Sequence, residues 1–178
     1  MKRLCIVPCG SKKVWDQAPS IGATEARHAY IGTFHKACQQ YALQFFSDWV
    51  ILSAKYGFLF PFDMVEENYD VSFRSKSPDR ISVEELKRQA VEKGLNDYHE
   101  IVVLGGKKYR KVVEQVFDNS KLAYPLSDCK GIGFMVQKLQ RAVQEKKEIL
   151  FTPSSKRQSF IEVGKSDEAQ RRISLQER

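Results

Sequence analysis

Three short apolar runs in the chain are each followed by a loop of small and basic residues and, further on, by a helical segment. The runs cover 4–7, 49–52 and 101–104, and each has the length of a buried strand. Alternation of strand, loop and helix is typical of a parallel sheet with helices packed on it. We therefore predict an α/β fold with a mostly parallel central sheet of about four to five strands and helices on both faces.

Apolar residues spaced three and four apart predict amphipathic helices between these runs. The first covers 26–45, with Thr24 as its N-cap and Gly32 as a point where it kinks or divides. On this phase His28 and His35 fall on the polar face, so we expect both to be surface histidines. Further helices are expected from Ser82 to Gly94, from Lys107 to Phe117 and from Phe134 to Val143.

The length of 178 residues suits one domain with a full core. We expect residues 1–150 to form a single α/β domain. Residues 151–178 are polar and are expected to be a C-terminal tail, partly helical over 166–177. The segment 64–80 has no clear period and many turn formers, which indicates an ordered surface loop. A loop this long inside a domain is usually functional or mobile.

The formal net charge of +7 and the pI of about 9.2 indicate a basic surface that attracts polyanions. Nucleic acid or a nucleotide is therefore the expected partner. No window has the apolar length of a membrane-spanning helix, and the first apolar run is too short for a signal peptide, so we expect a cytoplasmic protein without membrane contact. The four cysteines form no CxxC pair and are expected to be free thiols. Neither a metal site nor a cofactor is indicated.

The loop after the first strand, CGSKK at 9–13, combines a glycine with a serine and two lysines. Backbone N–H groups and ammonium groups that converge after a strand form a cradle for anions. The spacing differs from that of a Walker A loop, and a basic turn without a ligand is the alternative interpretation. Beside two lysines, Cys9 is also a candidate nucleophile.

The second and third loops repeat this pattern. At 53–57, SAKYG places a hydroxyl, an amine and a phenol next to a glycine, although a polar turn carrying core aromatics would look similar. At 105–109, GGKKY offers two glycines that allow a ligand close to the backbone before a helix begins. Tyr30, near the start of the first helix, is expected to project toward Gly10.

Parallel strands carry their loops at one edge of the sheet, so the three loops can converge on a single rim. We predict that this rim binds the ligand. The predicted ligand-binding residues are Cys9, Gly10, Ser11, Lys12, Lys13, Tyr30, Ser53, Lys55, Tyr56, Gly57, Gly105, Gly106, Lys107 and Tyr109.

Each residue type at the predicted rim suits one part of a nucleotide. Lysines would face a phosphate, and tyrosines could stack on a base. Asp63 or Asp70 could bond a ribose or base edge or act as a general base, and Lys55 completes the candidate catalytic set. Cleavage of a glycosidic bond or base exchange fits such a set best, because it needs one carboxylate and positioned donors without a metal.

The second loop and its continuation resemble a known family. The stretch 52–63, LSAKYGFLFPFD, followed by Tyr69, is similar to the YaaA-like family of bacterial proteins, in which a strand ends in a Leu-Ser-(small)-x-Tyr-Gly pattern. The first loop resembles a related bacterial and phage domain that opens with Cys-Gly-x-x-Lys. The resemblance covers roughly 4–143. It implies a mixed α/β body, DNA binding and a link to peroxide stress, and it does not imply a settled reaction.

Two functions are therefore compatible with the sequence. One is a nucleic-acid- or nucleotide-binding α/β protein that acts as an enzyme on a nucleobase or glycosidic bond. The alternative is a non-catalytic DNA-binding or stress-response protein of the YaaA-like type, whose basic helix faces contact backbone phosphates.

Overall fold

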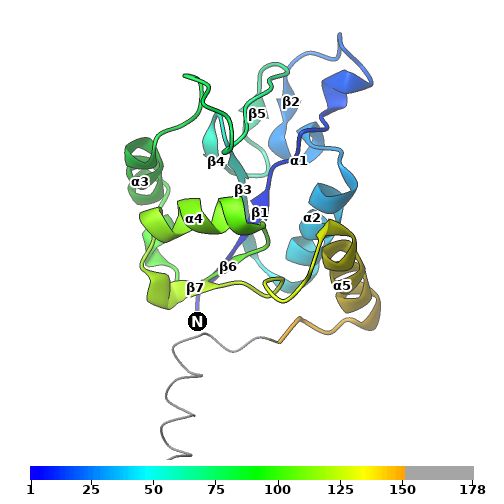
Figure 1. Ribbon diagram of the computed structural model, residues 1–178, viewed down its shortest axis with the longest axis vertical. Helices are drawn as coiled ribbons and strands as arrows, with labels where there is room; N and C mark the ends of the chain where they lie inside the picture. Colours follow the sequence, from blue (N-terminus) through cyan, green and yellow to red (C-terminus); the bar gives the residue numbers. More distant parts are fainter. Residues whose placement is uncertain (151–178) are drawn as a thin grey trace, which may run out of the picture.

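A five-stranded sheet in the order β4-β3-β1-β6-β7 forms the centre of the protein (Figure 1). The computed structural model describes residues 1–150, so the predicted tail at 151–178 lies outside the described residues. The strands of this sheet are β1 (Arg3–Pro8), β3 (Asp48–Ser53), β4 (Gly57–Leu59), β6 (Glu100–Val103) and β7 (Leu122–Ala123). All neighbours pair in parallel except β3 and β4. The predicted mostly parallel sheet is confirmed.

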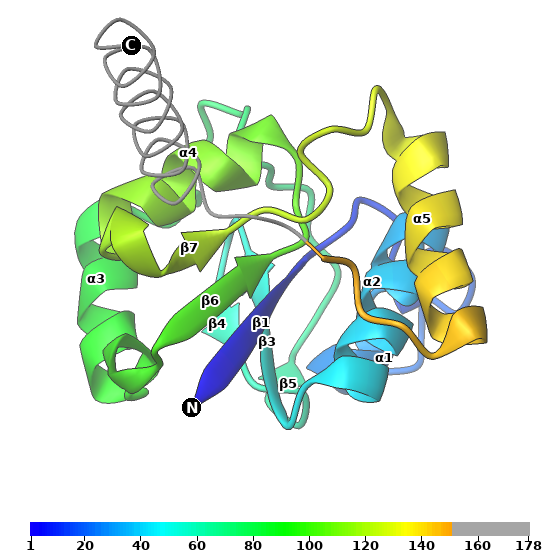
Figure 2. The same ribbon diagram turned by 90° about the horizontal axis from the view of Figure 1, so that it is seen from below.

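Two helical layers cover the sheet (Figure 2). On one face lie α2 (Thr33–Phe45) and α5 (Ile132–Glu145), and on the other lie α3 (Val83–Glu92) and α4 (Lys107–Val116). Strand β1 serves both layers, since Cys5 and Val7 are buried in one core, and Leu4 and Ile6 in the other. A strand that is buried on both sides reads as a continuous apolar run, which is why it could be found in the sequence.

The helix predicted over 26–45 is divided in the structure. Its first turn is a short α1 (Ala26–Ala29), and the residues just before it form β2 (Thr24–Glu25), which pairs with β5 (Met64–Val65). Thr24 is therefore a strand residue, and the prediction that it caps the helix was wrong. Residues 30–32 leave the helix because they pair with the first loop, through a Lys13–Tyr30 bridge and an Ile31 N–H bond to Lys12 O at 3.1 Å. Gly32 then precedes α2.

Strand β4 was missed in the sequence because it is only three residues long. The chain reverses at Gly57, where φ is +78°, a conformation that glycine adopts without strain. Gln89 of α3 holds the turn by accepting the N–H of Phe58 at 2.8 Å and donating to Tyr56 O at 2.9 Å. A side chain at Gly57 would also meet Gln89 Oε1 at 2.2 Å, so this glycine is required by the fold rather than by a ligand.

The helix predicted from Ser82 begins as expected. The Ser82 side chain accepts the N–H of Glu85 at 3.1 Å, which is the N-cap interaction that the sequence indicated. Helix α4 begins after Gly106, also close to its predicted start. Across residues 1–150, no helix combines the length and the apolar character needed to cross a membrane.

Candidate functional site

The loops after β1, β3 and β6 lie together at the carboxyl edge of the sheet. Strand β1 stands between β3 and β6, and the chain leaves it toward β3 first and crosses to β6 later. The strand ladders continue into the loops through a Cys9 N–H bond to Leu52 O at 3.2 Å and a Leu104 N–H bond to Ile6 O at 3.0 Å. In open α/β sheets this reversal of strand order is where ligands bind. We call the group formed by Cys9, Lys13, Tyr30, Ser53, Lys55, Tyr56, Tyr69 and Tyr109 the rim.

A chain of three hydroxyls occupies the middle of the rim. Ser53 Oγ lies 2.8 Å from the Tyr69 hydroxyl, which in turn bonds to the Tyr30 hydroxyl. All three residues are buried, with Tyr30 only 2% exposed. Burial raises the pKa of both tyrosines well above the usual range, so the hydroxyls stay protonated and neutral.

The direction of these hydrogen bonds follows from Ser53. Its Oγ accepts the N–H groups of Lys55 at 3.2 Å and Tyr56 at 3.1 Å, which uses both lone pairs of the oxygen. The Ser53 O–H must then donate to Tyr69. Either tyrosine can donate in the bond between Tyr69 and Tyr30, so one hydroxyl hydrogen of this pair is left that no described residue accepts.

Two lysines approach the same aromatic ring from the loops after β1 and β3. The ammonium of Lys13 lies 4.3 Å from the centre of the Tyr69 ring, and that of Lys55 lies 5.7 Å from it. Lys13 is only 3% exposed and donates to Ser11 O at 3.2 Å. Burial lowers the pKa of Lys13, and the neighbouring Cys9, Asp16 and Asp70 partly oppose this shift. A buried ammonium facing aromatic rings is a strong attractor for an anion.

Cys9 and Tyr109 join the loops after β1 and β6. The Tyr109 hydroxyl donates to Cys9 O at 3.1 Å and lies 3.2 Å from Cys9 Sγ. Burial is the main cause that raises the pKa of Tyr109, and the nearby Cys9 raises it further. Gly105 makes room for this ring, since a Cβ there would meet Tyr109 Cγ at 2.6 Å. The glycine predicted to admit a ligand therefore admits a tyrosine ring.

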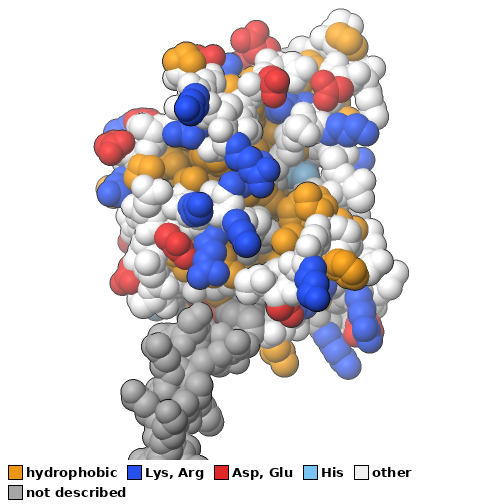
Figure 3. Space-filling view, in the orientation of Figure 1, with side chains coloured by type: hydrophobic (Ala, Val, Ile, Leu, Met, Phe, Trp, Pro, Cys, Tyr) orange, Lys and Arg blue, Asp and Glu red, His pale blue; other side chains and the backbone are white. Residues whose placement is uncertain are grey.

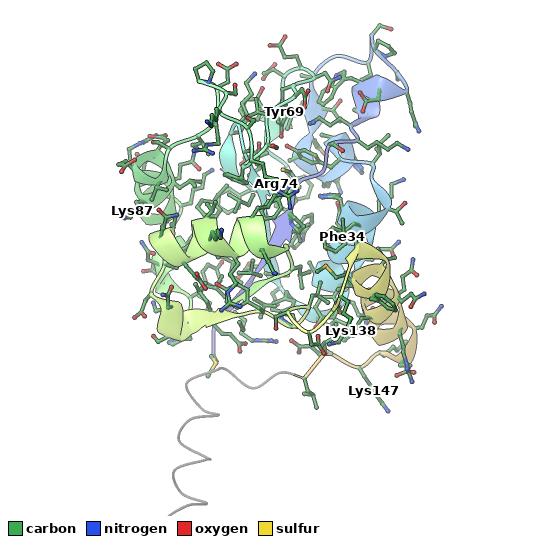
Figure 4. The ribbon with its side chains drawn as sticks, in the orientation of Figure 1. Phe34, Tyr69, Arg74, Lys87, Lys138 and Lys147 are labelled. Atoms are coloured by element: carbon green, nitrogen blue, oxygen red, sulfur yellow. The ribbon has the colours of Figure 1, made fainter. Side chains whose placement is uncertain are left out.

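The loop after β5 supplies two aromatic rings that contact rim residues, and one of them, Tyr69, is labelled in Figure 4. Tyr69 meets Tyr56 edge-on, with 5.3 Å between ring centres, and Phe73 meets Tyr109 in the same way at 5.5 Å. Neither Tyr69 nor Phe73 was among the predicted ligand-binding residues. The available signal was an isolated aromatic in a polar loop, at Asn68-Tyr69-Asp70, and Tyr69 entered the sequence analysis only through the YaaA-like resemblance.

The two candidate acids lie in different places. Asp70 is exposed near Lys13, at the margin of the rim. Asp63 instead holds the turn between β4 and β5, where its carboxylate accepts the Phe60 N–H at 2.7 Å and lies 3.6 Å from Lys93 Nζ at the end of α3. The catalytic role predicted for Asp63 has no support in this geometry, since its Oδ2 bonds the Phe60 N–H within the turn and faces Lys93 rather than the rim.

The remaining predicted residues surround the rim, and Ser11 joins its hydrogen bonds only through the backbone carbonyl that accepts from Lys13 Nζ. Gly10 is half-buried, while Ser11 and Lys12 are exposed in the first loop. Gly106 is the residue before α4, and Lys107 is exposed at the start of that helix. Among residues 1–150 no three His, Cys, Asp or Glu side chains are grouped as metal ligands.

His35 is buried next to Tyr30 of the rim. The prediction that it is a surface histidine was therefore wrong. It is 2% exposed, and its Nδ1 donates to Pro8 O at 2.8 Å, while Nε2 lies 3.0 Å from the Gln39 side-chain amide. Its ring lies 5.2 Å from that of Tyr30. Burial lowers the pKa of His35 below its usual value. His28 is exposed, as expected.

A groove of about 570 Å³ opens beside the rim, between α3 and α4. Its position on the face shown in Figure 3 is marked by Lys and Arg side chains that gather over α4, with apolar surface between them. The residues that line the groove are Phe73, Arg74, Arg80, Ile81, Ser82, Val83, Leu86, Lys107, Lys108, Lys111, Val112 and Gln115.

The relatives of the chain match it over nearly all of the described residues. A model of a family of unknown function, DUF6884, matches residues 4–141. The chain belongs to this family. It is also similar to the uncharacterized protein YfjM of Bacillus subtilis (strain 168), with 53% identity over 150 residues, which are 84% of this chain and 100% of YfjM.

The DUF6884 match contains every residue of the rim and of the groove, because both lie between Cys9 and Gln115. Membership in DUF6884 establishes homology and does not assign a function. Since one fold hosts many activities, the function has to be argued from the site itself.

Proposed function

We propose that this member of DUF6884 binds a nucleotide, free or within a nucleic acid, at the rim. The observation that carries the proposal is the placement of Lys13 and Lys55 against the Tyr69 ring, next to the buried hydroxyl pair of Tyr30 and Tyr69, which has one hydrogen left to donate. The ammonium groups suit a phosphate, the ring of the half-buried Tyr56 suits a base, and the remaining hydroxyl hydrogen of the Tyr30–Tyr69 pair suits a ligand oxygen. The net charge of +7 favours the same class of ligand.

In the catalytic form of this proposal the rim acts on a nucleobase or its glycosidic bond. Asp70 is then the general base, since it is the one candidate acid near Lys13. Lys13 and Lys55 hold the anionic part of the substrate. This form requires no metal ion.

The second candidate is a non-catalytic DNA-binding protein of the YaaA-like type. The observation that favours it is the groove, whose five cations (Arg74, Arg80, Lys107, Lys108 and Lys111) lie outside the rim. In this case the rim would serve the fold or a small signal ligand, and the groove would contact backbone phosphates.

Calorimetric titration with nucleoside mono- and triphosphates at low salt tests the first proposal. We expect Lys55→Ala to weaken binding at least tenfold (about 1.4 kcal/mol), since an ammonium that faces the ligand is lost. Lys87→Ala is the control, because Lys87 is exposed on α3 and does not line the groove. Absence of nucleotide binding to the wild-type protein, or equal losses in both variants, would overturn the rim as the site. Release of free base from a bound nucleotide, abolished by Asp70→Asn, would identify the catalytic form.

A further inference from the structure

The groove between α3 and α4 gathers several cations without a carboxylate among its lining residues. The lining contains five Lys or Arg residues and neither Asp nor Glu. The two arginines elsewhere on the same helices have acidic partners: Arg88 pairs with Glu85 and Glu92, and Arg110 pairs with Glu114 at 2.8 Å. On α4, therefore, Arg110 has a carboxylate partner, whereas the groove-facing lysines make no ion pair within the described residues.

One groove arginine is held in place by backbone carbonyls. Arg80 donates to Phe73 O at 3.0 Å and to Ser75 O at 3.2 Å. Carbonyl acceptors orient the guanidinium but do not neutralise it, so its charge remains available for an anion. Arg74, from the same loop, lies between Tyr69 and α4 in the view of Figure 4.

The floor of the groove is apolar, and the groove joins the rim at Tyr109. Ile81, Val83, Leu86 and Val112 form the apolar part of the lining, and Phe73 continues it toward the rim. Phe73 meets the Tyr109 ring at 5.5 Å, and Lys108 Nζ lies 5.2 Å from the same ring. A ligand that occupies the rim can therefore extend into the groove past Tyr109.

We propose that the groove holds the phosphate backbone of a single-stranded nucleic acid, one nucleotide of which occupies the rim. This inference rests on the proposed function and adds the form of the ligand: a strand rather than a free nucleotide or a duplex. Lys107 and Lys111 are four residues apart on α4 and so about 6 Å apart along its axis, which lets them contact successive phosphates. The apolar floor favours unstacked bases, which a duplex does not expose.

Fluorescence anisotropy tests this with a labelled single strand of about 12 nucleotides, as DNA and as RNA, and with the corresponding duplex. Affinity is measured over a series of salt concentrations for the wild type and for a Lys107→Ala/Lys111→Ala variant. Each lost phosphate contact reduces the slope of log K against log salt by about 0.7 for a single strand, so we expect a reduction of about 1.4. Lys87→Ala is the matched control and should keep the wild-type slope.

The outcomes separate the groove from the rim. If the double variant keeps the wild-type slope while Lys55→Ala still weakens mononucleotide binding, the groove inference fails and the proposed function stands. If the double variant loses strand binding while no mononucleotide binds and Lys55→Ala has no effect on the strand, the rim fails and the groove remains. Duplex binding as tight as strand binding, or mononucleotide affinity equal to that of the strand, would overturn the single-strand assignment.

Discussion

The rim and the groove both present lysines, but they hold them in opposite environments. Lys13 at the rim is 3% exposed and its ammonium lies against the Tyr69 ring, whereas Lys107 and Lys111 in the groove are exposed on α4. Burial strengthens the interaction of a charge with an anion and also makes the unpaired charge costly to fold. Exposed charges cost little and are screened by salt.

Because of this difference in burial, the rim and the groove contribute different properties to ligand binding. The rim is suited to selectivity, since buried donors that lack a partner penalise ligands without matching groups. The groove is suited to affinity that depends on ionic strength. Substitutions at the rim should therefore change stability and selectivity together, and substitutions in the groove should leave stability nearly unchanged.

The largest expected effect comes from Gly105→Ala. Its Cβ would lie 2.6 Å from Tyr109 Cγ, so the ring that bonds Cys9 must shift, and we expect a loss of about 2–3 kcal/mol in the free energy of unfolding. Gly106→Ala is the matched control, because a Cβ there meets nothing within 4 Å. Urea denaturation measures both. Equal stabilities for the two variants would contradict the close packing of Tyr109 against Gly105.

An intermediate effect is expected from the protonation of His35 behind the rim. Burial lowers the folded-state pKa of His35 below 6.5, so between that lowered value and about 6.5 the unfolded chain binds a proton that the folded protein does not. Stability should therefore be complete above about pH 6.5 and fall as the pH drops below it, by at most about 1.4 kcal/mol per pH unit.

Urea denaturation at pH 5 and pH 7.5 measures this slope, and His35→Gln is the comparison. The variant should be less stable at neutral pH, because it loses the bond to Pro8 O, but its stability should depend less on pH in this window. The carboxyl groups titrate mostly below it. An undiminished slope in His35→Gln would place the pH dependence elsewhere.

The smallest expected effects on stability are those of Lys13→Met at the rim and Lys111→Ala in the groove. Removing a buried charge and keeping its apolar length should leave stability unchanged or raise it by about 1 kcal/mol, while nucleotide binding at the rim is lost. Lys111→Ala in the groove should change stability by less than about 0.5 kcal/mol. Thermal denaturation with and without nucleotide checks both. A strongly destabilised Lys13→Met would show that the ammonium serves the fold.

Much of the fold could be predicted because burial on both faces leaves a clear pattern. The apolar runs at 4–7, 49–52 and 101–104 became β1, β3 and β6, and the N-cap at Ser82 opened α3. The short strand β4 was missed, and a division of the helix was expected at Gly32 but without the pairing of residues 30–32. Both features depend on Gln89 and on the first loop, which are distant in sequence. Local propensity does not contain such contacts.

The sequence by itself determined the α/β architecture and the three strand-end loops, because periodicity and small residues after apolar runs are local properties. Only the tertiary structure decided which polar residues meet. Asp63 and Gly57 lie in turns, and Gly105 leaves room for the Tyr109 ring. Tyr69 lies at the centre of the rim, although it comes from a loop that has no periodic sequence pattern. The physical reason is that a binding site depends on side chains meeting in space, and the Ser53–Tyr69–Tyr30 chain joins residues from three separate segments.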